Sequence, residues 1–250
     1  MSLGWEAFIP VHLKKIRLLP DCYPAVDCYP FNVPALRETR EIPFTTPVTF
    51  FVGENGTGKS TLLEAVARRC GIHIWTSEYT PRMEHNPHEE KLHLYMAVEW
   101  AAGSVPGSYF SARIFRTFAE MTEVVAANDP GQLRYYGGKS LLSQSHGQSL
   151  LSYFGARYQL RGLHFLDEPE TALSPRNQIQ LLRLLRDMAR AGHAQFLVAT
   201  HSPILLACPG ATLYSLDSSP IQAIAYEETE HYRLCHEFMA DPQAYLASIQ

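Results

Sequence analysis

One nine-residue segment, "GENGTGKST" (Gly53–Thr61), constrains the fold of this chain more than any other feature. It matches the pattern G-x-x-x-x-G-K-[ST] at every fixed position. The apolar run "VTFFV" before it predicts a buried strand, and the apolar side chains after Ser60 recur at helical spacing. A strand, a glycine-rich loop and a helix in this order form a phosphate-binding loop, because backbone N–H groups and a helix N-terminus then point at one anion.

The residues of this loop have separate expected roles. Its three glycines allow the backbone to curl so that successive N–H groups face inward. Lys59 would reach the β- and γ-phosphates, and Ser60 would offer its hydroxyl to Mg²⁺. We therefore predict that bound ATP contacts the whole loop: Gly53, Glu54, Asn55, Gly56, Thr57, Gly58, Lys59, Ser60 and Thr61.

Two adjacent carboxylates follow a second predicted strand, in "LHFLDEPE" (163–170). Asp167 would hold Mg²⁺ beside the triphosphate, usually through water. Glu168 would orient and deprotonate the attacking water. Side chains alternate along a strand, so both carboxylates cannot face the same way within it. Pro169 ends the strand at once, and this frees Glu168 to turn back toward the metal.

A histidine follows a third apolar strand, in "FLVATHSP", which places His201 at the carboxyl end of that strand. Ligands of an open α/β sheet collect at this edge. A lone histidine is more often structural, but its position after an apolar strand and downstream of Asp167 favours a functional role. A neutral imidazole at His201 would hydrogen-bond the γ-phosphate and the attacking water.

The rest of the chain predicts an α/β fold. Strands at 163–166 and 196–200 alternate with helices near 116–127, from Gly147, after the N-cap Ser174 and from about Glu227. This alternation predicts a mostly parallel sheet with helices on its faces, and we expect an N-terminal antiparallel β region before it. We expect one domain over 1–250, with a nucleotide-binding core at 1–75 and 160–250 and a helical insertion at about 76–159. Residues 76–108 are expected to be irregular.

Composition narrows the class of protein. The formal net charge of −4 gives no electrostatic footprint for nucleic acid, although a local basic patch remains compatible with it. Five scattered cysteines favour reduced thiols and a cytoplasmic location. No apolar run reaches the length of a membrane helix, so we expect no direct membrane insertion. Metal binding by Cys22 and Cys28, or by His85, His88 and His93, is less favoured than a surface loop and an exposed insertion.

Five segments taken in order resemble the ABC-type ATPases: GENGTGKST, SHGQS, LHFLDEPE, TALSP and ATHSP. They span residues 53–203 and look closest to the soluble branch of SMC, RecF and compact stand-alone AAA-family ATPases of prokaryotes. The resemblance implies a P-loop NTPase of ABC-ATPase type that binds ATP and Mg²⁺ and hydrolyses ATP. It also implies that the helical insertion carries the signature loop, SHGQS.

The resemblance further implies a homodimer in the ATP-bound state. In this family the signature loop of one molecule covers the γ-phosphate of ATP held by another. Carried over by position, Ser145, Gly147 and Gln148 would contact ATP in the second copy, so two copies would enclose two ATP molecules head to tail. Hydrolysis would release the pair and act on a DNA or protein partner. The plain alternative is that this segment is an ordinary helix cap.

The sequence departs from the family pattern at several positions. His146 and Ser174 stand where the family usually has Gly and Asp, and the glutamine that normally follows the phosphate-loop helix is missing. Arg113, in a strand candidate at 108–115, lies near that place. Tyr29 or Phe31 could stack on adenine, and either one could equally be a core residue.

Three rival functions remain. The chain resembles the ATP-binding subunit of a membrane transporter, although the missing glutamine argues against that reading. A P-loop kinase acting on a small molecule has no use for SHGQS or for His201. A nucleotide-gated binding module with negligible turnover would be excluded by steady ATPase activity.

Overall fold

A six-stranded sheet with the strand order β5-β6-β7-β3-β8-β9 forms the centre of the protein. The computed structural model describes residues 11–75, 86–129, 131, 133–134, 138, 140–143 and 146–248. All neighbouring strands are parallel except β8 and β9, which form an antiparallel pair. The strands are β3 (Val48–Val52), β5 (Gly107–Ser111), β6 (Gly162–Asp167), β7 (Ala194–Ala199), β8 (Thr212–Ser215) and β9 (Gln222–Ala223).

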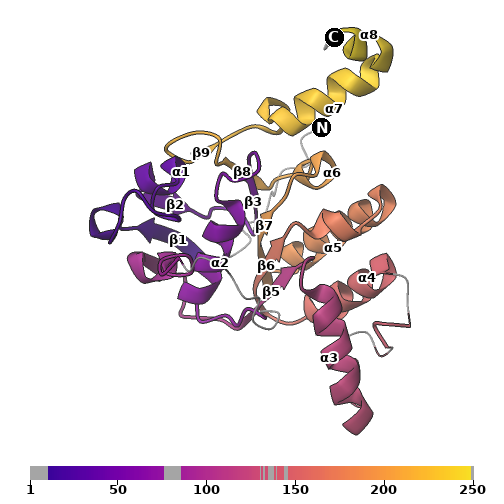
Figure 1. Cartoon of the computed structure of the whole chain (residues 1–250). Helices are drawn as coiled ribbons and strands as arrows, with labels where there is room; N and C mark the ends of the chain where they lie inside the picture. Colours follow the sequence, from indigo (N-terminus) through magenta and orange to yellow (C-terminus); the bar gives the residue numbers. More distant parts are fainter. Residues whose placement is uncertain are drawn as a thin grey trace.

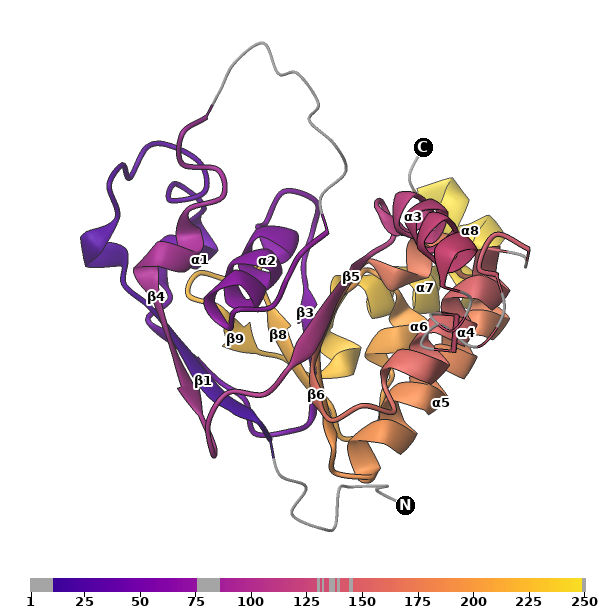
Figure 2. The same ribbon diagram turned by 90° about the horizontal axis from the view of Figure 1, so that it is seen from below.

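Helices cover both faces of this sheet (Figure 1). On one face lies α2, and α4, α5 and α6 lie on the other, as Figure 2 also shows. Alternating side chains of β3 divide the core accordingly, since Phe51 packs in the cluster with α2 and Phe50 in the cluster with α5. The helices are α1 (Pro34–Glu38), α2 (Lys59–Arg69), α3 (Phe115–Asn128), α4 (His146–Arg157), α5 (Pro175–Arg190), α6 (Pro203–Leu206), α7 (Glu230–Ala240) and α8 (Pro242–Ser248).

A second, three-stranded antiparallel sheet has the order β2-β1-β4. It consists of β1 (Leu13–Leu18), β2 (Glu41–Pro43) and β4 (Met96–Trp100). The prediction that 76–108 is irregular is therefore wrong for its second half, which contains β4 and the start of β5. The strand β4 is short and is stabilised by pairing with β1, about 80 residues away, so its local sequence gives only a weak signal.

One buried amide joins the two sheets. Gln195 of β7 accepts hydrogen bonds from the backbone N–H groups of His12 and Leu13, each 2.8 Å long. The same side chain donates to the carbonyl of Leu13 at 3.0 Å. All of these groups are buried, so the amide satisfies backbone atoms that would otherwise lack partners at the start of β1.

Helix boundaries follow their capping residues. Ser174 caps α5, as expected, by accepting a hydrogen bond from the N–H of Asn177. The last predicted helix begins slightly later than expected, because Tyr226–Glu228 forms a 3-10 turn and Thr229 then caps α7. Two further 3-10 turns span Pro20–Cys22 and Leu92–Tyr95, and a third follows β6 at Pro169–Ala172.

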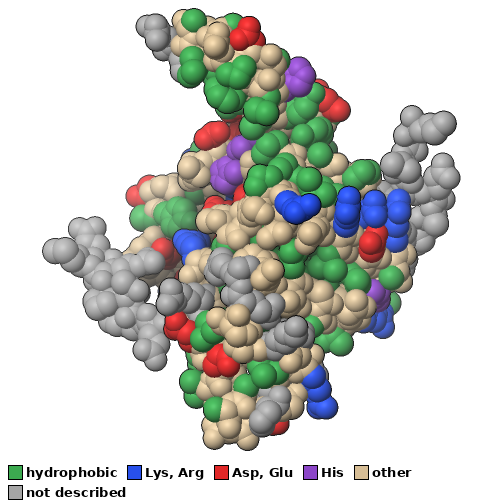
Figure 3. Space-filling model, turned by 90° about the vertical axis from the view of Figure 1, so that its right-hand side faces the viewer, with side chains coloured by type: hydrophobic (Ala, Val, Ile, Leu, Met, Phe, Trp, Pro, Cys, Tyr) green, Lys and Arg blue, Asp and Glu red, His purple; other side chains and the backbone are tan. Residues whose placement is uncertain are grey.

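The C-terminal helices α7 and α8 project from the body as an arm (Figure 1). Figure 3 shows hydrophobic side chains gathered on it. Four of its apolar side chains are exposed: Leu234, Phe238, Met239 and Leu246. Within the described ranges, no helix combines the length and the apolar character needed to cross a membrane.

Candidate active site

Four neighbouring parallel strands end at one level of the central sheet. The register pairs Asp167 of β6 with Ser111 of β5 on one side and with Ala199 of β7 on the other. Ala199 in turn pairs with Phe51 of β3. Because the carboxyl ends of parallel strands share an edge, the residues after these positions come together. The phosphate loop, the acidic pair and the histidine predicted from the sequence all follow one of these strands.

The phosphate loop curls through two residues in the left-handed region, Gly56 with φ 84° and Gly58 with φ 95°. Glycine adopts these angles without the steric cost that a Cβ atom adds. Gly58 is the N-cap of α2, so the loop opens directly into the helix N-terminus. The Nζ of Lys59 lies inside the curl and donates to the carbonyls of Gly53 at 2.6 Å and Glu54 at 2.8 Å.

Lys59 is the cation at the centre of an acidic cluster. Lys59 is only 5% exposed. Burial lowers the pKa of Lys59, whereas the carboxylates of Glu168, Asp217, Glu54 and Asp167 act in the opposite direction and raise it. Several carboxylates around a single ammonium favour the binding of a further cation at this edge.

Ser60 and Asp167, predicted as metal ligands, are brought together. The hydroxyl of Ser60 donates to Oδ1 of Asp167 at 2.8 Å, and Asp167 is 2% exposed. Burial raises the pKa of Asp167, and the hydrogen bond from Ser60 partly offsets this effect. A hydroxyl and a carboxylate are the oxygen donors that Mg²⁺ prefers, so the residues fit this ion.

Arg113 lies beside the same carboxylate. It follows β5, and its Nη2 is 3.7 Å from Oδ2 of Asp167. The sequence had suggested that Arg113 stands near the place of the missing glutamine, and the structure puts it next to the predicted metal ligand. A guanidinium cannot coordinate a cation, so Arg113 acts on Asp167 by charge rather than as a ligand.

Glu168 leaves the line of β6 through an unusual backbone conformation. Its φ is 47°, and among the described residues no other non-glycine residue has a positive φ. Such a conformation costs free energy outside glycine, and it is typical of functional sites. It turns Glu168 toward the next strand, where Oε1 lies 3.9 Å from Nε2 of His201. Pro169 then begins a 3-10 turn, as the interruption of the strand predicted.

His201 is held on two sides. Its backbone N–H donates to Oε1 of Glu170 at 2.6 Å, and its Nδ1 lies 2.9 Å from Nε2 of His231. Burial lowers the pKa of His201, and the nearby charge of Lys59 and the ring of His231 lower it further. The imidazole of His201 is therefore neutral at neutral pH, the state expected from the sequence.

Three residues at this edge escaped the sequence analysis. Glu170 has a buried Oε2 atom without a hydrogen-bond partner in the described part of the chain. Asp217, after β8, accepts a hydrogen bond from the N–H of Glu54 at 2.7 Å. His231 comes from α7. The segment "DEPE" could have indicated Glu170, because it places a third carboxylate after the same strand. Nothing local in the sequence indicates Asp217 or His231.

The described part of the signature segment belongs to the start of α4, which packs near the beginning of α5. Ser145 falls outside the described residues, and α4 begins at His146. A Cβ atom on Gly147 would lie 2.4 Å from Nδ2 of Asn177, so the glycine lets the start of α4 approach α5 of its own chain. Gln148 is exposed. The helices α4 and α2 lie on opposite faces of the sheet (Figures 1 and 2).

The two candidates for adenine stacking differ. Phe31 is 0% exposed and packs against Tyr23 and Tyr95. Phe31 therefore belongs to the core, which is one of the two alternatives that the sequence left open for it. Tyr29 is exposed, and its hydroxyl hydrogen-bonds that of Thr61 at the end of the phosphate loop.

Two family models match parts of the chain. A model described as "AAA domain, putative AbiEii toxin, Type IV TA system" matches residues 131–207. A model described as "AAA domain" matches residues 29–70. The matched ranges include the acidic pair and His201 in one case and the phosphate loop in the other. No curated protein matches the sequence significantly.

Solved structures of similar fold include components of ABC transporters and an SMC head. The chain is similar to cbiO1 from Clostridium perfringens, part of an ABC transporter complex, with 15% identity, a TM-score of 0.54, and coverage of 96% of this chain and 100% of that one. An ATP-binding cassette of an ABC transporter in its ADP conformation has 16% identity, a TM-score of 0.53, and coverage of 95% and 98%. An SMC head bound to the C-terminal winged-helix domain of ScpA has 12% identity, a TM-score of 0.53, and coverage of 86% and 98%.

The fold and the partial family matches agree with the resemblance stated from the five motifs. Two AAA-domain models match parts of the chain, and its fold is similar to that of ATP-binding cassette structures. Its fold, with a mostly parallel core sheet and an added antiparallel sheet, is also as predicted.

Proposed function

We propose that the chain binds Mg-ATP at the phosphate loop, pairs head to tail with a second copy on the bound nucleotide, and hydrolyses ATP to release the pair. One observation carries this proposal. Five side chains meet at the carboxyl edge of the central sheet: Lys59, Ser60, Asp167, Glu168 and His201. The helix α4, which begins in the signature segment, lies on the face of the sheet opposite α2. A nucleotide at this edge would meet these five side chains, and we infer that the start of α4 meets the nucleotide of a second copy.

Each side chain at the edge has one task. The loop amides and Lys59 grip the phosphates, and Ser60 and Asp167 hold Mg²⁺, which neutralises charge on the β- and γ-phosphates when bound. Glu168 accepts a proton from the attacking water. His201 donates a hydrogen bond to the γ-phosphate and keeps it aligned with that water. The turned backbone of Glu168 supports this role, because it directs the carboxylate toward His201 rather than along β6.

In this proposal, residues of the second copy cover the bound nucleotide. Ser145, Gly147 and Gln148 would contact the γ-phosphate held by the other subunit, and the N-terminus of α4 would add its partial positive charge. The contact of Gly147 with Asn177 would keep the start of α4 close to α5 in its own subunit. A two-fold axis would then create two identical sites from two incomplete ones.

The proposal is tested with Glu168→Gln, which keeps the size of the side chain but removes the base. We expect this variant to bind Mg-ATP, to hydrolyse it at least ~10²-fold more slowly, and to accumulate as a dimer on size exclusion. Glu99→Gln is the matched control, because Glu99 lies on β4 in the other sheet and pairs only with Lys15 among the described residues. A Glu168→Gln protein that remains monomeric in saturating Mg-ATP contradicts the proposed pairing.

The motion of opening and closing would act on a DNA or protein partner. The formal charge of −4 does not favour DNA over protein. Duplex DNA mixed with the Glu168→Gln dimer separates the two possibilities. A mobility shift that needs ATP and weakens steeply with salt supports DNA, and the absence of any shift favours a protein.

A further inference from the structure

His201 has a neighbour with no assigned role, the imidazole of His231 in the first turn of α7. Nε2 of His231 lies 2.9 Å from Nδ1 of His201, and the two ring centroids are 5.1 Å apart. The proposed reaction uses the other nitrogen of His201, Nε2. A hydrogen bond to one imidazole nitrogen determines whether the other carries the proton, so this contact bears directly on what His201 offers to ATP.

We propose that His231 is a positioning residue: its Nε2–H donates to Nδ1 of His201 and so holds His201 in the tautomer that is protonated on Nε2. This inference rests on the proposed function. It adds to the ATPase site a residue from α7, which no motif of the sequence includes.

The surroundings of His201 favour this tautomer. Its Nε2 lies 3.9 Å from Oε1 of Glu168. An N–H directed toward a carboxylate is attracted, whereas a nitrogen lone pair directed toward it is repelled. Protonation on Nε2 leaves Nδ1 of the neutral ring as an acceptor, and Nε2 of His231 must then be the donor.

Two unpartnered atoms lead to the same assignment. Among the described residues, Nε2 of His201 and Nδ1 of His231 are buried without hydrogen-bond partners. In the proposed assignment the atom left over on His231 is an acceptor, and the donor left over on His201 faces the place of the γ-phosphate. The opposite assignment makes Nδ1–H of His231 the unpartnered donor instead, and no acceptor lies beside it among the described residues. Each assignment leaves one donor and one acceptor, and the proposed one directs the donor toward a carboxylate, Oε1 of Glu168 at 3.9 Å.

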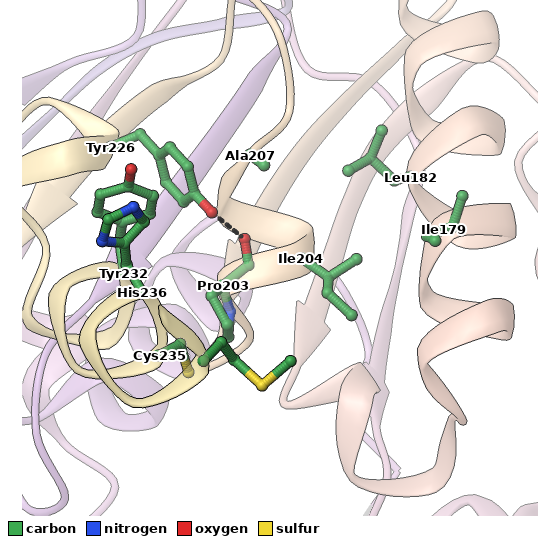
Figure 4. A pocket seen from close by; sticks show the side chains of 10 residues that line it. Ile179, Leu182, Pro203, Ile204, Ala207, Tyr226, Tyr232, Cys235 and His236 are labelled. Atoms are coloured by element: carbon green, nitrogen blue, oxygen red, sulfur yellow. Dashed lines mark hydrogen bonds between the residues drawn. The ribbon is translucent and has the colours of Figure 1, made fainter. Parts of the chain in front are cut away.

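The start of α7 is fixed in place by further contacts. Thr229 caps the helix by accepting a hydrogen bond from the N–H of Tyr232. The hydroxyl of Tyr226, in the 3-10 turn before α7, donates to the carbonyl of Pro203 at 2.9 Å (Figure 4). Pro203 is two residues after His201. The contact between His231 and His201 is therefore one of two side-chain hydrogen bonds that tie the beginning of α7 to the segment after β7.

Activity measurements on three variants test the role. His231→Leu removes the donor, and we expect kcat to fall about 10-fold while the Kd for ATP stays within about 2-fold. His231→Gln places an amide N–H where the imidazole Nε2–H was, so we expect kcat to return to within about 3-fold of the wild type. His236→Leu is the control in the same helix, because His236 stacks on Tyr232 and makes no hydrogen bond with His201 in the described part of the chain; its kcat should be unchanged.

A measurement of the tautomer does not depend on activity. Long-range ¹H–¹⁵N spectra report which nitrogen of each histidine is protonated, and His201→Gln identifies the His201 signals by their loss. We expect His201 to be protonated only on Nε2 in the wild type and to show mixed tautomers in His231→Leu. Protonation on Nδ1 in the wild type, or His201 signals that do not move in His231→Leu, overturns the inference. If the tautomer is as expected and no variant hydrolyses ATP, the proposed function fails instead.

Discussion

The two ends of the candidate site are held in different ways. At the phosphate-loop end, Lys59 bonds to the carbonyls of Gly53 and Glu54, and the hydroxyl of Thr57 bonds to the same carbonyl of Glu54. These contacts all lie within seven residues of sequence. At the histidine end, His201 depends on Glu170, 31 residues earlier, and on His231, 30 residues later.

This difference indicates which end of the site is more sensitive to substitutions at distant positions. The loop is held mainly by its own residues, with one distant hydrogen bond from the N–H of Glu54 to Asp217, so it keeps its shape when the strand and helix beside it form. An imidazole held by two distant elements moves when either element moves. We therefore expect substitutions at distant positions to alter the rate of hydrolysis more readily than the affinity for ATP.

The largest effect is expected at the phosphate-loop end. Lys59→Ala removes the only side-chain cation inside the loop curl, so ATP affinity should fall at least ~100-fold by calorimetry. Lys91→Ala, at an exposed position, is the control and should bind as the wild type does. Unchanged affinity in Lys59→Ala would mean that the phosphates bind elsewhere.

A change at the histidine end should separate rate from affinity. Glu170→Ala leaves the N–H of His201 without its acceptor, so we expect kcat to fall about 10-fold while the Kd for ATP changes less than about 2-fold. The unpaired N–H should also lower the free energy of unfolding by about 1–3 kcal/mol. If Glu170→Ala weakens ATP binding as strongly as it slows turnover, the two ends are not independent.

The same carboxyl gives a pH-dependent prediction. Burial raises the pKa of Glu170, so its proton leaves the unfolded chain at lower pH than it leaves the folded protein. Ionisation of Glu170 therefore lowers stability as pH rises above the ordinary glutamate range. Glu170→Gln removes this loss and keeps an oxygen acceptor for His201. The variant should gain about 1 kcal/mol of unfolding free energy relative to wild type between pH 4 and pH 7.5, measured by urea denaturation; an equal difference at both pH values would contradict this cause.

The smallest effect is expected at Asp217. Asp217→Asn keeps an oxygen that accepts from the N–H of Glu54 but removes a negative charge beside the phosphate loop. ATP binding should become about 3-fold tighter at low salt and approach the wild-type value at high salt, because the lost repulsion is screened. Weaker binding at both salt concentrations would show that the charge of Asp217 helps to shape the loop.

The sequence allowed the fold class and most of the site to be predicted because their signals are local. The phosphate loop, the acidic strand end and the histidine each combine an apolar run with a fixed polar pattern. The strand β4 was missed because its partner β1 is distant in the chain. Glu170, Asp217 and His231 were missed as site residues because their importance comes from positions across the sheet edge. The role of Phe31 stayed open because the local sequence around an aromatic residue does not reveal its burial.

The structure of Glu168→Gln with bound Mg-ATP tests the central claim most directly. The account predicts two copies around a two-fold axis, with residues 145–148 of each within about 3 Å of the γ-phosphate held by the other. It would be contradicted if ATP were bound at Lys59 while residues 145–148 faced bulk solvent or packed within their own subunit.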